Sequence, residues 1–192
     1  MGLTAAYDSW RVAVSDENAT AVYEIQDWLE LSQRGTGAAR QPAQARAVVE
    51  VHKFTGGKSQ RAMIGGDIRL GGPAARTIRV GQSSGLTLGA AATCHSELAR
   101  PLVPGLPPEF ARAALSGIFR VHADWSPALL ITVDRAAYDE VDSSEFAFEF
   151  AGRLLLATLL QAIAGSLVAR TLTDRHARPR SRPMPAAFSG NS

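Results

Sequence analysis

The spacing of apolar residues predicts a sheet through the middle of the chain. Residues 47–52 (A-V-V-E-V-H) are rich in β-branched side chains, which favour strands. Residues 128–133 (A-L-L-I-T-V) form a continuous apolar run, which is typical of a strand buried on both faces. Strands are predicted at residues 47–52, 60–70, 77–80, 86–92 and 128–133.

Helical spacing predicts two helices. Pro107 and Pro108 stand where helix N-termini favour proline, and apolar residues recur at helical spacing after them, at Phe110, Ala114, Gly117, Ile118 and Val121. Residues 146–168 predict a longer apolar helix, in which Phe146 and Phe150 share one face and Phe148 is expected to be partly exposed.

A capping box precedes the second predicted helix. Residues 142–145 read D-S-S-E, so Asp142 is expected to accept hydrogen bonds from the first turn while Glu145 reaches back.

The first 44 residues leave two interpretations open. Residues 10–14 alternate like a short strand, and residues 15–18 (S-D-E-N) are typical of a helix start. Residues 19–31 fit either a helix or a strand. Residues 32–44 are rich in Gly, Ala, Gln and Arg and predict a linker.

These patterns predict three parts and an α+β fold. Residues 1–44 form an N-terminal extension and linker, residues 45–170 form the folded core, and residues 171–192 form a disordered Arg- and Pro-rich tail. The order of strands and helices predicts a sheet with helices on one face.

Composition changes this picture little. Of 192 residues, 46% are hydrophobic and 20% are charged, which is typical of a globular protein. The formal net charge of +2 is too small to establish a polyanionic partner. A single cysteine, Cys94, excludes an intrachain disulfide. We expect a cytoplasmic protein, because the start has no signal-peptide pattern and residues 154–169 are too short to predict a membrane span.

Candidate metal and phosphate sites are weak. Gly57-Lys-Ser59 resembles the end of a phosphate-binding loop, but His52 stands where that motif needs a glycine. Of the candidate metal ligands His52, His95, His122 and Cys94, only Cys94 and His95 are close in sequence, and neighbours on a strand point to opposite faces. We therefore expect neither a metal nor a cofactor.

Catalytic groups are equally sparse. The acids Asp139, Glu140, Asp142 and Glu145 are better explained by a helix cap and a loop than by acid–base chemistry. No nucleophile elbow occurs, so we expect a protein that is not an enzyme. The basic tail is equally consistent with RNA binding and with a solvated end.

Three segments resemble, in order, domain IV of elongation factor G. Residues 53–60 (K-F-T-G-G-K-S-Q) are similar to the family's K-x-S-G-G-R-G-Q loop, and residues 107–118 (P-P-E-F-A-R-A-A-L-S-G-I) to its P-x-E-Y helix. Residues 130–152 contain Y-D-E-V-D-S-S-E and resemble the family's strand, Y-H-D-V-D-S-S-E loop and following helix. Together these matches cover about residues 47–163.

The resemblance implies a fold similar to ribosomal protein S5 domain 2, with about four strands backed by two helices. In that family the domain is the tip that reaches the decoding site of the small ribosomal subunit, where two loops meet RNA. The implied RNA- or ribosome-binding residues are Thr55, Gly56, Gly57, Lys58, Ser59, Gln60, Arg61, Tyr138, Asp139 and Glu140. The chain contains no GTPase domain, so it is not expected to drive translocation itself.

Three positions depart from the family pattern. Asp139 replaces the tip histidine, Ser59 replaces a glycine, and Arg61 replaces the usual aromatic residue. Together with Glu140 and Asp142, Asp139 makes the second loop acidic, and RNA phosphate repels acids at short range.

Two functions therefore stay open. The first is a non-catalytic ribosome- or RNA-binding module that acts in translation or modulates it. The second is a protein-interaction module that kept the fold and lost the RNA-binding tip. An enzyme on the same fold is a weaker third hypothesis, because the glycine loop does not fit nucleotide binding.

Overall fold

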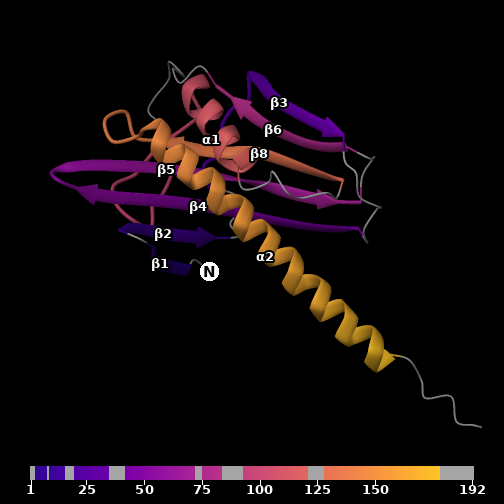
Figure 1. The fold of residues 1–192 in the computed structure, drawn as a ribbon. Helices are drawn as coiled ribbons and strands as arrows, with labels where there is room; N and C mark the ends of the chain where they lie inside the picture. Colours follow the sequence, from indigo (N-terminus) through magenta and orange to yellow (C-terminus); the bar gives the residue numbers. More distant parts are fainter. Residues whose placement is uncertain are drawn as a thin grey trace, which may run out of the picture.

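The computed structural model describes residues 3–7, 9–15, 20–34, 42–71, 75–83, 93–120 and 128–177. Within these ranges the protein has one eight-stranded sheet and two helices, as Figure 1 shows. The elements are β1 (Leu3–Tyr7), β2 (Trp10–Ser15), β3 (Asp27–Arg34), β4 (Ala43–Thr55), β5 (Lys58–Leu70), β6 (Ala75–Gln82), β7 (Val103–Pro104), α1 (Pro108–Arg120), β8 (Leu129–Tyr138) and α2 (Glu145–Ala177).

The sheet is mixed. Its strand order is β1-β2-β4-β5-β8-β6-β3, and the short β7 pairs with the end of β8. All pairs are antiparallel except β6 with β8. The expectation of about four strands was therefore wrong in number, because β1, β2 and β3 of the first 34 residues join the same sheet and β7 adds a short pair.

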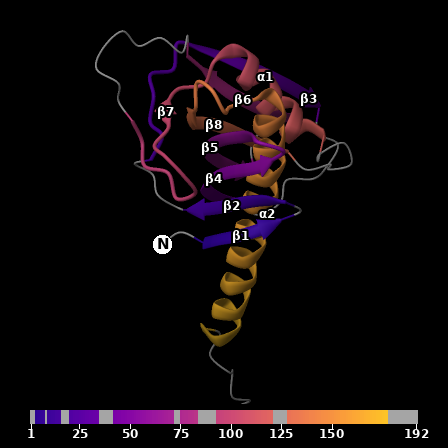
Figure 2. The same ribbon diagram turned by 90° about the vertical axis from the view of Figure 1, so that its left-hand side faces the viewer.

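Both helices contact the sheet, and α1 packs against α2. Figures 1 and 2 show that α2 crosses the strands obliquely and continues past the sheet. The main core lies beneath the helices. It joins Val49 and Val51 of β4 to Ile64 of β5, Val133 of β8 and Leu155 of α2, all without solvent exposure.

Packing accounts for part of the apolar character of α2. Residues Glu145–Gly165 are long and apolar enough to cross a membrane by composition alone, and 44% of that window is buried inside the protein. Phe148 is fully buried and stacks on Phe110 with ring centroids 4.7 Å apart, whereas Phe146 is 53% exposed. The prediction for Phe148 was wrong because α2 is covered by α1 as well as by the sheet.

A second, smaller cluster lies on the other face of the sheet. Val48, Met63 and Ala137 pack with Ala21 and Leu102 there. Their strand neighbours Val49, Ile64 and Ala136 belong to the main core, and side chains alternate along a strand. Residues 20–22 and 94–102 therefore cover part of the face that the helices leave open.

The N-terminal predictions have mixed outcomes. Residues 10–14 are a strand as predicted, within β2. Of the two alternatives for residues 19–31, the strand is the one present, since β3 begins at Asp27 and residues 23–26 are irregular. The linker predicted at residues 32–44 is too long at both ends. Ser32–Arg34 belong to β3, and β4 already begins at Ala43. The predicted helix start at residues 16–18 lies outside the described residues.

Elsewhere, four of the five predicted strands are present, as parts of β4, β5, β6 and β8. The strand predicted at residues 128–133 begins one residue late, at Leu129. The fifth, at residues 86–92, lies outside the described residues. The tail prediction was wrong for residues 171–177, which continue α2, and residues 178–192 lie outside the described residues.

Two glycines set the distance between the helices. A Cβ atom on Gly117 of α1 would lie 2.0 Å from the Glu149 carbonyl oxygen, and one on Gly152 of α2 would lie 2.4 Å from the Ala114 carbonyl oxygen. Real side chains do not approach backbone so closely, so neither position accepts a larger residue without moving the helices apart.

We expect Gly117→Ala and Gly152→Ala each to destabilise the protein by about 1–3 kcal/mol, because each overpacks the helix contact. The matched control is Gly165→Ala, also in α2, where a new Cβ meets nothing within 4 Å. That substitution should stabilise by about 0.5–1 kcal/mol through helix propensity. Urea denaturation measures all three, and equal effects at the three positions would contradict the close-contact argument.

Candidate nucleic-acid interface at two tip loops

The β4–β5 hairpin forms the first tip loop. Thr55 pairs with Lys58, and Gly56 and Gly57 between them have φ angles of 60° and 78°. A two-residue hairpin turn of this kind needs two successive left-handed residues, which glycine adopts without steric cost. All four residues are exposed, so the turn offers its backbone and the Lys58 ammonium to solvent.

The second tip loop connects β8 to α2 and comprises residues 139–144. Ser144 caps α2, because its Oγ accepts a hydrogen bond from the Ala147 amide at 3.2 Å. The prediction that Asp142 is the cap was therefore wrong. The Asp142 carboxylate instead accepts a hydrogen bond from Arg100 at 3.0 Å.

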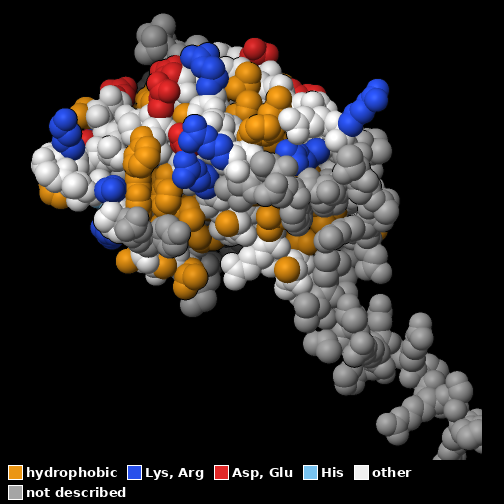
Figure 3. Space-filling view, in the orientation of Figure 1, with side chains coloured by type: hydrophobic (Ala, Val, Ile, Leu, Met, Phe, Trp, Pro, Cys, Tyr) orange, Lys and Arg blue, Asp and Glu red, His pale blue; other side chains and the backbone are white. Residues whose placement is uncertain are grey.

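Two hydrogen bonds to the backbone of Arg61 join the hairpin to the second loop. The Arg61 amide donates to the Asp142 carbonyl at 2.9 Å, and the Ser143 hydroxyl donates to the Arg61 carbonyl at 2.9 Å. The same hydroxyl accepts from the Asp139 amide at 2.8 Å. Segments more than 75 residues apart in sequence are thus held side by side at one end of the sheet. Figure 3 shows basic and hydrophobic side chains together at the surface of the end that carries the hairpin.

A buried guanidinium lies behind this junction. Arg61 is only 1% exposed. Its Nη1 donates to Asp139 Oδ2 at 3.2 Å, and its Nη2 donates to Glu50 Oε1 at 3.4 Å and Ser96 Oγ at 2.9 Å. Nη2 also lies 2.7 Å from the carbonyl oxygen of Arg100. Arginine stays protonated in proteins, so this buried charge needs the two carboxylates around it.

Glu50 is held in turn by the segment around Ser96. The Ser96 hydroxyl donates to Glu50 Oε1 at 2.5 Å, and the Glu97 amide donates to Glu50 Oε2 at 2.8 Å. Both carboxylate oxygens of this buried acid therefore have partners, as a buried charge requires.

Asp139 binds a second arginine. Arg100 donates from Nε to Oδ2 at 2.7 Å and from Nη2 to Oδ1 at 2.9 Å, which is a two-point arginine–carboxylate pair. The amides of Val141 and Asp142 each donate to Oδ1 at 3.0 Å. Burial alone would raise the pKa of Asp139, but the hydrogen bonds from Arg100 and these amides outweigh it and lower the pKa to about 2. The same carboxylate raises the pKa of Arg100.

The structure separates the predicted RNA contacts into two groups. Arg61, Tyr138 and Asp139 are largely buried, with exposed fractions of 1%, 8% and 8%, so their side chains offer little surface to RNA. Tyr138 lies on the helix side, where its ring centroid is 6.1 Å from that of Phe110. The predicted contacts that are exposed or half-buried are Thr55, Gly56, Gly57, Lys58, Ser59, Gln60 and Glu140.

Two exposed tip residues were missed. Phe54 is 69% exposed beside the glycine turn, and Val141 is 82% exposed in the second loop. A large apolar residue next to a Gly-Gly turn is a usable signal, because tight turns project their flanking side chains into solvent.

His52 lies near this turn, and its Nε2 is 3.0 Å from Ser59 Oγ. Burial is the main cause that lowers the pKa of this histidine, and the positive charges of Arg61 and Arg11 lower it further.

Glu50, Ser96 and Arg100 were also missed as members of the tip. They lie 11, 35 and 39 residues from Arg61 in sequence, and only the folded chain brings them to it. No local pattern marks a single acid within a strand or a single serine within an irregular segment as a partner of a buried cation.

Metal and nucleotide sites find no support in the part of the chain that the structure describes. It contains no group of three His, Cys, Asp or Glu residues that could hold a metal ion. Gly57 and Lys58 lie in a turn between antiparallel strands, whereas a phosphate-binding loop joins a strand to a helix. Cys94 is half-buried, and burial together with Glu50 raises the pKa of its thiol.

Replacing Arg61 by methionine should destabilise the protein by about 3–5 kcal/mol, because Glu50 and Asp139 would keep buried charges without their cation. Arg112→Met, at an exposed position of α1, is the matched control and should change stability by less than about 0.5 kcal/mol. Adding Asp139→Asn to Arg61→Met should cost less than the sum of the single changes. Additive values in urea denaturation would contradict the coupling.

The Asp139 pKa makes the stability of the protein depend on pH. Because its folded pKa of about 2 lies below the ordinary 3.8, the ionised carboxylate stabilises the fold above pH 4, and this contribution is lost between about pH 4 and pH 2. Asp139→Asn should lower stability at pH 6 and flatten this acid-side loss. Glu140→Gln, which leaves Asp139 intact, should retain it. Melting temperatures across this pH range measure the difference, and parallel curves for wild type and Asp139→Asn would refute it.

Comparison with known proteins adds no assignment. No protein-family model matches the chain, and no curated protein matches it either.

Proposed function

We propose that this protein is a non-catalytic RNA-binding module, related to domain IV of elongation factor G, which contacts the ribosome through its two tip loops. The observation that carries the proposal is the direct junction between the loops. The two segments that resemble the family's RNA-contacting loops are hydrogen-bonded to each other through Arg61, Asp142 and Ser143.

The connectivity supports the finer fold assignment within this proposal. Leaving aside β1, β2, β3 and the two-residue β7, the chain runs through three strands, a helix, a strand and a helix. The strands have the order β4-β5-β8-β6, with β6 and β8 parallel. We propose that this unit is the S5 domain 2-like fold implied by the resemblance, and that the first 34 residues extend its sheet at both edges.

The exposed chemistry of the hairpin suits RNA. Gly56 and Gly57 have no side chains, so an RNA backbone can approach the turn closely, and Lys58 offers a cation to a phosphate. Phe54 offers an exposed ring on which an unpaired base can stack. The acidity of the second loop is weaker than its sequence suggests, because Arg61 and Arg100 both pair with Asp139.

A protein partner is the second candidate, and one observation favours it. Phe54 and Val141 are large apolar side chains exposed at the same end of the molecule, and aromatic anchors often dominate protein–protein interfaces. The burial of Arg61, Tyr138 and Asp139 also removes three polar groups that an RNA-binding tip could have used.

Sedimentation with purified small ribosomal subunits at low salt distinguishes the candidates. We expect the full chain to pellet with the subunits. Phe54→Ala combined with Lys58→Glu should weaken binding at least about fivefold, since one base stack is worth about 1–3 kcal/mol. The control Arg112→Glu also reverses one positive charge, but at an exposed position of α1. It should bind like wild type.

The salt dependence supplies a second criterion. Phosphate contacts release counterions, so raising the salt from about 50 to 200 mM should weaken binding. Failure to pellet at low salt, or pelleting that the tip variant leaves unchanged, would overturn RNA binding by the tip. Tip-dependent capture of a protein without RNA would favour the second candidate.

A further inference from the structure

The far half of the sheet has a face that no helix of the described residues covers. Ile78 and Val80 of β6 point into the core beneath the helices, so Arg79 between them points to the opposite face. By the same alternation and by the strand register, β3, β4, β5 and β8 also place side chains on this face opposite the helices. We call this surface the open face and define it by Trp28, Arg34, Arg46, Arg69 and Arg79.

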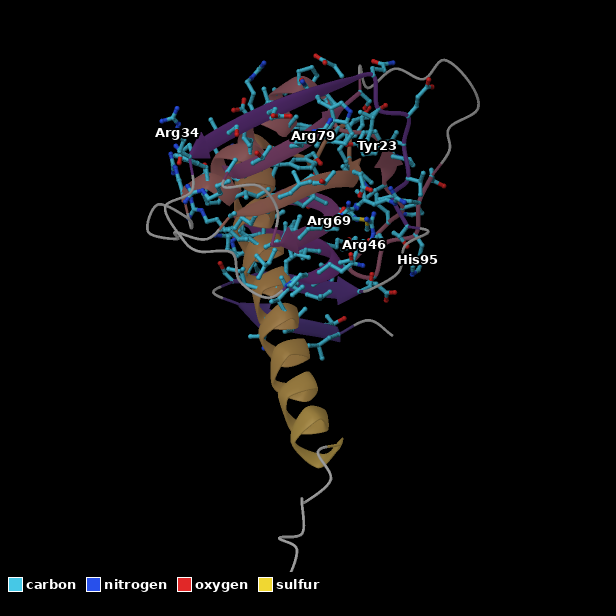
Figure 4. The ribbon with its side chains drawn as sticks, turned by 90° about the vertical axis from the view of Figure 1, so that its right-hand side faces the viewer. Tyr23, Arg34, Arg46, Arg69, Arg79 and His95 are labelled. Carbon is cyan, nitrogen blue, oxygen red and sulfur yellow. The ribbon has the colours of Figure 1, made fainter. Side chains whose placement is uncertain are left out.

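Among the described residues, the segments that pack on this side of the sheet lie over its tip half. The small cluster around Met63 and Ala137 marks the covered half, where residues 20–22 and 94–102 pack. The arginines of the open face lie toward the other end of the strands, at the start of β4 and the end of β5, for example. Figure 4 shows Arg34, Arg79, Arg69 and Arg46 spread across the strands from β3 to β4.

The charge of the open face is positive. Its four arginines face three acids on the same strand surface, which are Glu30, Asp67 and Asp134. Arg46 donates to Asp134 at 2.6 Å and lies 3.7 Å from Asp67, which also accepts from Arg69 at 3.0 Å. These shared acids hold the guanidinium groups in place without neutralising all of them.

Two features suit a nucleic-acid strand rather than a lone anion. A groove of about 260 Å³ lies at Gln44, Arg46, Asp67 and Arg69, with Arg69 63% exposed at its side. Two strands further along, the Arg79 guanidinium lies over the Trp28 ring, 4.5 Å from its centroid. A planar cation supported by an indole is a surface on which a base can stack.

We propose that the open face binds single-stranded RNA, with phosphates at Arg34, Arg46 and Arg69 and a base on the Arg79–Trp28 stack. The site is separate from the tip loops, which lie at the other end of the strands, and it does not need the tip to bind. It extends the proposed function, because RNA that enters or leaves the tip would gain a second contact on the same molecule. Arginine-rich sheet surfaces with an aromatic platform fit unpaired strands, whose bases are free to stack.

The test measures the anisotropy of a labelled oligouridine of about 12 nucleotides with the full-length protein at low salt. Arg34→Glu combined with Arg69→Glu changes two exposed positions and should weaken binding about tenfold or more. The double substitution should also reduce the slope of log affinity against log salt by about 1.4, since each phosphate contact to a single strand contributes about 0.7. Trp28→Ala should weaken binding about fivefold or more through the lost stack.

One control tests whether any loss of positive charge weakens binding. Arg112→Glu on α1 makes one matching charge reversal away from both surfaces. It should leave oligouridine affinity within about twofold of wild type. Circular dichroism melting confirms that each variant is folded.

Several results would overturn the open-face proposal. Wild-type protein could fail to bind the oligouridine, or bind a duplex of equal length as tightly. The open-face variant could bind like wild type, or lose no more affinity than Arg112→Glu. If the open-face variants bind normally while the tip variant no longer pellets with ribosomal subunits, the second site is refuted and the proposed function stands. If the open-face variants lose oligouridine binding while the tip variant pellets normally, the open-face site stands and RNA binding by the tip is refuted.

Discussion

The burial of the Arg61 guanidinium constrains the whole tip. A charge with 1% exposure is costly unless compensating groups surround it, and arginine cannot escape the cost by losing its proton. Nη1 and Nη2 have such partners, whereas the buried Nε has no hydrogen-bond partner among the described residues. Glu50 on the adjacent strand, Asp139 after β8, Ser96 and the Arg100 carbonyl together surround it. These groups come from three segments, which are β4, the loop after β8 and residues 94–102, so fixing the Arg61 side chain on β5 fixes the relative positions of all three.

This constraint gives a physical meaning to two departures from the family pattern. Arg61 stands where the resemblance expects an aromatic residue, and Asp139 stands where it expects a histidine. Taken separately, each change places an unexpected charge at the tip. In the structure the two side chains are 3.2 Å apart and form one ion pair. Each of these buried charges would have fewer partners without the other. Because both charged side chains are largely buried, Phe54, Lys58 and the glycines remain as the exposed chemistry.

The sequence predicted the parts of the fold that local pattern controls. The β4, β5 and β8 strands and both helices carry strong periodicity, and the glycine turn was identified by composition. Where partners are distant, prediction failed. Residues 27–34 (D-W-L-E-L-S-Q-R) suit more than one conformation, and pairing with β6 makes them a strand. Asp142 has the residue type of a helix cap, but Arg100, 42 positions away, binds it while Ser144 caps α2. At the site, exposed turn residues were predictable and buried Arg61 was not, because its burial depends on Glu50 and Ser96.

The first 34 residues explain why the sheet has one covered half and one open half. Strand β8 pairs with β6 only as far as Val133, and beyond that point its edge needs other partners. The Ala136 amide donates to the Ala21 carbonyl at 3.0 Å, and β7 pairs with Ala137 and Tyr138. After Ala21 the chain passes to β6, where the Tyr23 hydroxyl donates to the Gly81 carbonyl at 2.6 Å, and then becomes β3.

The segment that completes the edge of β8 therefore also connects β2 at one side of the sheet to β3 at the other. Ala21 belongs to the Met63 cluster on the tip half, whereas Arg34 and Arg69 at the far end of the strands are exposed. The β8 edge that β6 leaves unpaired is thus completed by a segment that also helps to cover the tip half of the sheet.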